Sequence, residues 1–240
     1  MALKILITND DGIASAQLRR VAEWASRFAE VSVFAPATEQ SGKSQGIDLT
    51  SPIEVVKQEG YGEGIEAYSV SSTPADCVRI AMLAMKRKPD LIISGINNGY
   101  NVGFDILYSG TVGAIFEAAL LGFPAIALSA YYGSDPVPFE VLDRVKAYFD
   151  ENKLLECHSL YNVNIPDDPK EIKVARQGGA FYSDDFEVCG DGKYIARGIK
   201  IYEPGLGADL DTDYVSEGFI TVTPLSTDRT EQSIFEKLKQ

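Results

Sequence analysis

The sequence predicts an α/β fold in which helices cover a mostly parallel sheet and short β-hairpins project from it. From residue 3 to about 129, short β-rich runs alternate with segments of helical periodicity, a pattern typical of parallel strands joined by helices. After about residue 165, short segments separated by Gly, Pro and Asp replace this pattern, as at Gln177-Gly178-Gly179, and they indicate hairpins. With 240 residues, the chain can bury a sizeable core.

The first βαβ unit is the clearest part of the pattern. Leu3–Ile7 and Val31–Ala35 are short apolar runs and are predicted to be buried strands. Between them, apolar residues from Leu18 to Phe28 fall on one helical face. Further helices are predicted at Pro74–Arg87, Val112–Leu121 and Phe139–Phe149, and further strands at Asp90–Ser94 and Ala125–Ser129.

The end of the chain is expected to return to the main body. Gly218–Pro224 is predicted to be a strand and Thr227–Lys239 a terminal helix. We therefore expect a core over residues 1–166, a hairpin region over 167–216, and a C-terminal strand and helix over 217–240 that pack on the core or on a partner subunit.

The composition excludes several classes of protein. Apolar residues make up 45% of the chain and charged residues 24%, which excludes a wholly disordered protein. A net charge of −13 argues against binding of nucleic-acid polymers, because such surfaces need clustered Lys and Arg. No apolar run reaches the ~18 residues that cross a membrane, and no signal peptide is visible. Three cysteines without metal-type spacing favour reduced thiols in the cytoplasm.

The first candidate site follows the first predicted strand, at Thr8-Asn9-Asp10-Asp11-Gly12. In open α/β sheets, ligands bind beyond the carboxyl ends of the strands. Adjacent carboxylates repel each other, and a hard cation would offset that repulsion. The alternative is a helix-capping turn in which Asp11 caps the helix and Asp10 is solvated.

A second polar cluster, Thr38 to Ser44, follows the strand at Val31–Ala35. Ala37 to Ser44 fits a relaxed phosphate-loop pattern, which suggests a nucleoside-triphosphate switch. A phosphate loop requires a helix directly after its Lys-Ser pair. Residues 45–52 have the character of loop and strand instead, so the test of this alternative is whether a helix follows Lys43.

A non-catalytic nucleotide-binding or dinucleotide-cofactor module is the other alternative, because a βαβ unit opens the chain. No Gly-x-Gly-x-x-Gly turn follows the first strand. Asp10 and Asp11 would also repel a pyrophosphate there unless a metal intervened.

The third cluster follows the strand at Leu91–Ile93. Ser94 to Gly103 contains three asparagines and several glycines, which provide neutral oxygen ligands and allow close approach of the backbone. Ser109-Gly110-Thr111 then opens a helix and can bind an anion with hydroxyl and amide groups. Together these segments are typical of a phosphate site beside a metal.

Several collinear motifs resemble those of the SurE family and cover nearly the whole chain. They are Thr8-Asn9-Asp10-Asp11-Gly12, Gln40-Ser41-Gly42, Thr73-Pro74-Ala75-Asp76-Cys77-Val78, Pro89 to Asn97, Ser109 to Ala114, Asn162-Val163-Asn164-Ile165-Pro166 and Thr221 to Leu225. The resemblance implies a Rossmann-like, three-layer α/β fold with a protruding C-terminal hairpin region. It also implies a homodimer or homotetramer that hydrolyses nucleoside 5′- or 3′-monophosphates.

The resemblance also implies roles for single residues. One divalent cation per subunit, Mg²⁺ or Mn²⁺, would be held by Asp10, Asp11, Ser41 and Asn97. Asn9 and Asn98 would flank that site, Asn9 on the substrate side and Asn98 as a catalytic residue with the two aspartates. Phosphate would be bound by Ser109, Gly110 and Thr111. Either a carboxylate at the site, that of Asp10, activates water or one Asp attacks phosphorus directly; both mechanisms stay open.

Departures from the family pattern limit what the resemblance implies. Ser72 replaces a usual Gly, Lys43 replaces a small residue near the phosphate, and Gln177 to Asp213 matches only loosely. The lone His158 lies away from every cluster and is expected to be structural. Base preference, 3′ versus 5′ specificity, native metal, polyphosphate breakdown and dimer versus tetramer stay open.

Overall fold

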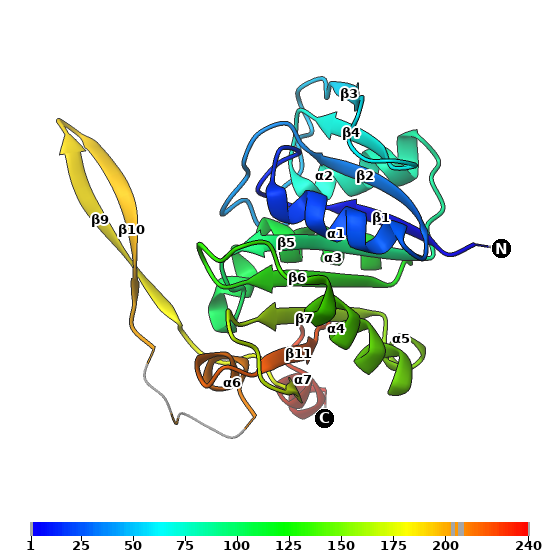
Figure 1. Cartoon of the computed structure of the whole chain (residues 1–240). Coiled ribbons are helices and arrows are strands. Elements are labelled where there is room, and N and C mark those ends of the chain that lie inside the picture. Colours follow the sequence, from blue (N-terminus) through cyan, green and yellow to red (C-terminus); the bar gives the residue numbers. More distant parts are fainter. Residues whose placement is uncertain (1, 203–204, 206–208, 240) are drawn as a thin grey trace.

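The computed structural model describes residues 2–202, 205 and 209–239, and it confirms the predicted α/β class. The main body is a nine-stranded sheet in the order β3-β4-β2-β1-β5-β6-β7-β11-β8 (Figure 1). Its strands are β1 (Lys4–Thr8), β2 (Glu30–Pro36), β3 (Val55–Gln58), β4 (Glu66–Val70), β5 (Leu91–Asn98), β6 (Ala125–Ala130), β7 (Leu160–Ile165), β8 (Ile172–Val174) and β11 (Ile220–Pro224).

The sheet is mostly parallel, as the alternating pattern predicts. Antiparallel pairing occurs only between β3 and β4 and between β11 and β7 among the described strands of this sheet. β11 also pairs in parallel with β8, so both of these late strands extend the main sheet. The predicted strand at Gly218–Pro224 therefore packs on the body of the same chain.

Helices cover both faces of the sheet and form three layers. The helices are α1 (Ala16–Ser26), α2 (Pro74–Arg79), α3 (Gly110–Leu120), α4 (Phe139–Glu151), α5 (Leu154–Cys157), α6 (Asp211–Ser216) and α7 (Gln232–Leu238). Side chains alternate between the faces of a strand. Ile5 and Ile7 of β1 therefore share one buried cluster with residues of α1 and α4, and Leu6 shares the other with residues of α2 and α3.

The predicted helix over Pro74–Arg87 is shorter than expected. The α-helix ends at Arg79 and a π-helical turn continues it to Ala84. Lys86 then adopts a left-handed conformation, and the Arg87 guanidinium pairs with Glu66 at 2.6 Å. The predicted terminal helix is also shorter, because regular structure begins only at Gln232.

The predicted strand at Asp90–Ser94 is longer than expected. β5 runs to Asn98, because Asn97 and Asn98 pair with Ser129 and Ala130 of β6 beyond a register irregularity. Gly95 lies at that irregularity with φ +136°, and a Cβ there would meet the Leu128 carbonyl oxygen at 2.2 Å. Only glycine fits this backbone.

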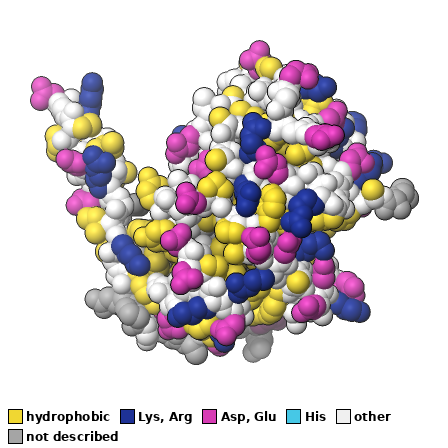
Figure 2. All heavy atoms as spheres, viewed as in Figure 1, with side chains coloured by type: hydrophobic (Ala, Val, Ile, Leu, Met, Phe, Trp, Pro, Cys, Tyr) yellow, Lys and Arg dark blue, Asp and Glu magenta, His cyan; other side chains and the backbone are white. Residues whose placement is uncertain are grey.

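A long hairpin extends from the body and pairs only with itself among the described residues (Figure 1). It consists of β9 (Tyr182–Gly190) and β10 (Lys193–Lys200). Val188 lies opposite Tyr194, and Phe186 lies opposite Ala196, so these four side chains share one face. An ion pair between Glu187 and Arg197 occupies the other face. Figure 2 shows hydrophobic side chains exposed along this arm.

The root of the hairpin is tied to the loop after β5 by Asp211, which is fully buried. The Asp211 carboxylate accepts hydrogen bonds from the backbone N–H groups of Gly103, at 3.1 and 3.2 Å, and Gly178, at 2.7 Å. The N–H of Phe104 donates to the Gly179 carbonyl oxygen at 3.1 Å. The hairpin is therefore anchored to the segment that leads into α3.

The structure bears on the predictions about membrane spans and cysteines. No helix in the described part of the chain is long and apolar enough to cross a membrane. Cys77 is buried, Cys157 and Cys189 are exposed, and all three are free thiols. Residues 203–204 and 206–208 of the predicted hairpin region lie outside the described residues.

Candidate functional site

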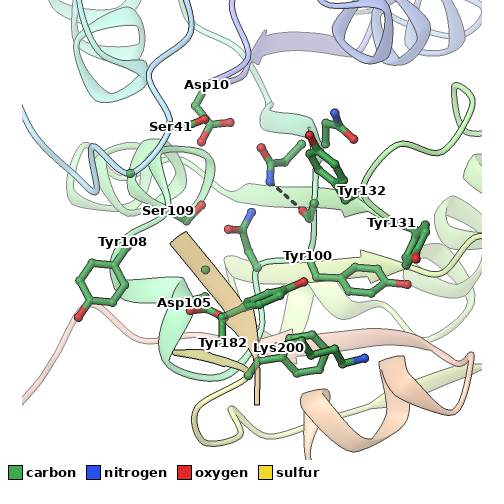
Figure 3. Close-up of a pocket in the computed structure, with 17 residues that line it drawn as sticks. Asp10, Ser41, Tyr100, Asp105, Tyr108, Ser109, Tyr131, Tyr132, Tyr182 and Lys200 are labelled. Atoms are coloured by element: carbon green, nitrogen blue, oxygen red, sulfur yellow. Dashed lines mark hydrogen bonds between the residues drawn. The ribbon is translucent and has the colours of Figure 1, made fainter. Parts of the chain in front are cut away.

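The predicted site residues come together at the carboxyl edge of the sheet. Figure 3 shows Asp10 beside Ser41, with Ser109 close by at the start of α3. Five of the predicted residues, Asp10, Ser41, Asn97, Asn98 and Ser109, line a pocket of about 570 Å³, whereas Asn9, Asp11, Gly110 and Thr111 are not part of its lining. The complete lining is Asp10, Ser41, Gly42, Asn97, Asn98, Gly99, Tyr100, Asn101, Asp105, Tyr108, Ser109, Tyr131, Tyr132, Phe181, Tyr182, Gly198 and Lys200.

Asp10 is buried and points at the first turn of α3. One carboxylate oxygen accepts the Thr111 hydroxyl at 2.5 Å, and the other accepts the Thr111 backbone N–H at 3.2 Å. Burial raises the pKa of Asp10 and outweighs the lowering effect of these hydrogen bonds. Burial therefore disfavours the negative charge of the Asp10 carboxylate, and a bound cation would stabilise that charge.

Asp11 turns toward β5 and does not cap a helix. Its carboxylate accepts the backbone N–H of Asn98 at 3.1 Å. The cap of α1 is Ser15, whose hydroxyl accepts the N–H of Leu18, so the helix-capping interpretation of Asp11 is wrong. Burial, followed by the charge of Asp10, raises the pKa of Asp11 to about 6.

Asn9 shapes the turn that brings the two carboxylates together. Its side chain is fully buried and exchanges two hydrogen bonds with Gly12, at 3.1 and 3.2 Å. Gly12 has φ +94° and lies close to the Pro36 carbonyl oxygen, a place for glycine alone. Both groups of the Asn9 amide therefore serve the turn.

Ser41 reaches the site on the segment that follows β2. The backbone N–H of Gln40 donates to the Asp10 carbonyl oxygen at 2.7 Å and ties this segment to the end of β1. The Ser41 hydroxyl donates to the Glu39 carboxylate at 2.6 Å. Charge on Glu39 further raises the pKa of Asp10 and Asp11, as a minor effect. The sequence reasoning missed Glu39, although it stands only two residues before Ser41.

No helix follows Lys43, so the phosphate-loop alternative fails its test. The described residues 45–54 form turns and irregular structure. Ser44 instead makes hydrogen bonds to the segment before α3. Its backbone N–H donates to the Tyr108 carbonyl oxygen, and its hydroxyl donates to the Leu107 carbonyl oxygen. The cradle of amide groups that a triphosphate needs is therefore missing from this part of the described chain.

Asn97 and Asn98 are the last two residues of β5. The Asn97 side-chain amide donates to the Gly99 carbonyl oxygen at 2.7 Å. The Asn98 side-chain oxygen accepts the N–H of Gly133 at 2.8 Å, so Asn98 joins the turn after β1 to the loop after β6. Both asparagines line the pocket beside Asp10.

Ser109, Gly110 and Thr111 begin α3 opposite the aspartates. The Ser109 hydroxyl caps the helix by accepting the N–H of Val112 at 3.0 Å, which leaves its proton free to donate. Gly110 packs so closely on Asp10 that a Cβ would lie 3.0 Å from that side chain. The structure directs the Thr111 hydroxyl and N–H to Asp10.

The donor set fits a hard divalent cation. No group of three or more His, Cys, Asp or Glu side chains within the described ranges is arranged to hold a metal. Two carboxylates, one hydroxyl and one amide oxygen remain at the site, from Asp10, Asp11, Ser41 and Asn97. Oxygen-only sites select Mg²⁺ or Mn²⁺ over softer metals.

The aromatic side of the pocket was missed by the sequence reasoning. Tyr100, Tyr131 and Tyr132 follow the ends of β5 and β6, and Phe181 and Tyr182 come from the hairpin root. A Tyr-Tyr pair directly after the strand at Ala125–Ala130 was the available signal, because residues at that edge face the site.

His158 precedes β7 at the opposite, amino edge of the sheet. Its ring Nε2 lies 2.6 Å from the Leu225 carbonyl oxygen, and the ring packs edge-on against Tyr161 at 5.5 Å. His158 therefore packs against Tyr161 and the backbone of Leu225, and it does not line the pocket.

Known proteins resemble this chain over nearly all of its length. The sequence profile described as "Survival protein SurE" matches residues 5–184. The "5'-nucleotidase SurE" of Thermoanaerobacter sp. (strain X514) is 40% identical over 254 residues, covering 98% of this chain and 97% of that protein. The protein of the same name from Thermosipho melanesiensis is 36% identical over 248 residues, covering 99% and 97%. The crystal structure of the SurE protein from Aquifex aeolicus matches with a TM-score of 0.76 and 31% identity, covering 98% of each chain. The chain therefore belongs to the SurE family.

Proposed function

We propose that this protein is a metal-dependent nucleotidase that hydrolyses nucleoside 5′- or 3′-monophosphates to nucleoside and phosphate. The observation that carries the proposal is that Asp10, Ser41 and Asn97 line one pocket with Ser109 of the α3 cap. Asp11 adjoins this pocket, because its carboxylate accepts the backbone N–H of Asn98. The relatives named 5'-nucleotidase SurE support the same activity.

The proposed cation is one Mg²⁺ or Mn²⁺ held by Asp10, Asp11, Ser41 and Asn97. When bound, such an ion neutralises charge on phosphoryl oxygens and acidifies water. The need for it is electrostatic, since the net charge is −13, the Asp10 carboxylate lines the pocket where an anionic substrate would bind, and Asp11 lies next to it on Asn98.

The chain's own groups bind and orient the phosphate. Ser109 can donate its hydroxyl proton, and the amide of Gly110 lies at the positive end of α3. We assign Thr111 mainly to orienting Asp10, because both of its donors go to that carboxylate. Asn9 contributes by fixing the turn that presents Asp10 and Asp11.

The carboxylates perform the bond-making step in one of two ways. In the first, Asp10 takes a proton from a water molecule that attacks phosphorus, and the P–O bond to the nucleoside breaks as the nucleoside leaves with a proton on that oxygen. In the second, one Asp carboxylate attacks phosphorus and expels the nucleoside in the same way, and water then hydrolyses the resulting acyl phosphate to free Asp and phosphate. Asn98, which holds Asp11 through its backbone N–H, keeps that carboxylate in place in both cases. Hydroxylamine, which cleaves acyl phosphates, distinguishes the two during turnover.

We further infer that the protein forms a homodimer or homotetramer through the hairpin region, residues 167–216. The support is the apolar face formed by Phe186, Val188, Tyr194 and Ala196, which the rest of the described chain leaves exposed. The domain limits at 166 and 216, a cytoplasmic location and the absence of a nucleic-acid partner stay predictions.

Phosphate release from AMP tests the proposal directly. The protein is stripped with EDTA, dialysed and assayed alone, with Mg²⁺ and with Mn²⁺. Activity should vanish in the stripped protein and return with either ion. Full activity without metal would contradict the metal assignment, and no release of phosphate from any nucleoside monophosphate would contradict the nucleotidase assignment.

A further inference from the structure

The pocket has two chemically different ends. Asp10, Ser41 and Ser109 line one end, with Tyr108 beside Ser109. Tyr100, Tyr131 and Tyr182 lie at the other end, together with Asp105 and Lys200, and Tyr132 stands at the side (Figure 3). A phosphate and a cation need only the polar end. The aromatic end, which the hydrolytic chemistry does not use, therefore fits another part of the substrate.

The deep part of the aromatic end is a preformed surface. Phe181 is 1% exposed, and its ring lies 6.5 Å from that of Tyr100 and 5.0 Å from that of Tyr182. Tyr100 also contacts Tyr131 edge-on at 5.8 Å. These rings hold one another in place, so a ligand need not order them on binding.

Tyr132 differs from these rings, because it stands free at the side of the pocket. It is 72% exposed, and no ring contact joins it to another aromatic residue of the described chain. Its backbone is nevertheless fixed, since the next residue, Gly133, donates its N–H to the Asn98 side chain at 2.8 Å. An exposed aromatic ring on an anchored loop is a ready stacking surface.

We propose that the aromatic end is a nucleobase subsite in which Tyr132 stacks on the base of the substrate. This inference rests on the proposed nucleotidase function and names the part of the substrate that gives affinity. Stacking of a base on an aromatic side chain contributes about 1–3 kcal/mol and tolerates every base, because each has a π-face. Purines, with the larger face, bind more tightly than pyrimidines, and a base-free sugar phosphate binds most weakly.

The test compares AMP with ribose 5-phosphate, which lacks the base. In the parent protein, KM for ribose 5-phosphate should exceed KM for AMP, and Tyr132→Ala should reduce the ratio of the two about tenfold. Tyr132→Phe keeps the ring and should preserve the ratio. Phe235→Ala removes an aromatic ring that is 47% exposed on α7, outside the pocket, and should also preserve it.

An unchanged ratio in Tyr132→Ala would overturn the subsite while leaving the nucleotidase assignment intact. Calorimetric binding of adenosine, which carries the base but no phosphate, gives a readout that does not depend on turnover or on the metal. Loss of adenosine affinity in Tyr132→Ala, in a protein that hydrolyses no monophosphate, would contradict the nucleotidase assignment but support the subsite. Equal adenosine affinity in parent and variant would overturn the subsite whatever the activity.

Discussion

The carboxyl edge of the sheet and the β9–β10 hairpin both depart from the usual arrangement of apolar side chains inside and polar side chains outside, but they do so in different ways. At the edge, polar groups are buried: Asp10 is 4% exposed and Asn9 fully buried. On the hairpin, apolar groups are exposed: Phe186 is 63% and Val188 67% exposed. Buried polar groups and exposed apolar faces both cost stability unless something compensates them. The two departures support the two proposals: a cation and substrate would compensate the buried carboxylates of the edge, and a partner subunit would cover the apolar face of the hairpin.

Asp10→Asn should give the largest effect, because it removes charge at the polar edge without changing shape. We expect kcat for AMP to fall by about 10²–10⁴-fold and Mg²⁺ affinity to fall as well, measured by phosphate release and by metal titration. His158→Ala, at the opposite edge of the sheet, is the control and should retain most activity. Equal losses in both variants would place the chemistry elsewhere.

The apolar face of the hairpin can be tested by making it polar. Phe186→Ser combined with Val188→Ser should weaken self-association by at least about tenfold, since two large side chains lose contact area on association. Light scattering across micromolar concentrations measures the mass. Leu120 is similarly exposed, at 64%, but lies on α3 away from the hairpin, so Leu120→Ser should leave the measured mass unchanged. A monomeric parent protein would contradict the proposed interface.

Ser41 and Lys43 are both exposed at the polar edge but should differ in effect. Ser41→Ala removes a proposed metal ligand, and we expect Mg²⁺ affinity to fall about 10- to 100-fold. Lys43→Ala removes an exposed cation and should raise KM for AMP by less than about fivefold. Metal titration and steady-state kinetics separate them. A larger effect of Lys43→Ala, with Mg-ATP binding that depends on this lysine, would favour a triphosphate protein.

The smallest expected effect is on stability against pH. Folding raises the pKa of Asp11 to about 6, above the ordinary value near 4, so the folded state holds this proton more tightly than the unfolded state. In EDTA, the free energy of unfolding should therefore decrease as pH rises from about 4 to 6. Asp11→Asn should flatten this dependence in denaturant melts, and saturating Mg²⁺ should reverse it. An identical slope in parent and variant would show that Asp11 is not responsible.

The sequence predicted most of the sheet, because local patterns determine buried strands. Leu3–Ile7 and Ala125–Ser129 match β1 and β6 within one residue. The end of β5 was missed, because Gly95, Asn97 and Asn98 are typical of loops, and only pairing with β6 makes them a strand. Long-range pairing of this kind leaves little signal in the segment itself.

The sequence identified polar residues around the pocket as candidates, but not the aromatic residues that line it. Asp10 and Asp11 are visible in the sequence as two adjacent carboxylates directly after a predicted strand. Tyr100 and Phe181 are separated by eighty residues, and only the packing of the hairpin root brings their rings together. The mistaken capping role for Asp11 has a similar cause, since the Asn9–Gly12 turn delays the start of α1 to Ser15.

The Asp211 junction determines where this protein can be remodelled. Insertions or a circular permutation at the hairpin tip, at Asp191-Gly192, disturb no residue of that junction. Excision of the whole arm together with Gly178 would leave the Asp211 carboxylate short of a donor and free the loop that carries Gly103. Designers who wish to graft a binding peptide onto this scaffold should therefore use the tip and keep residues 176–179 intact.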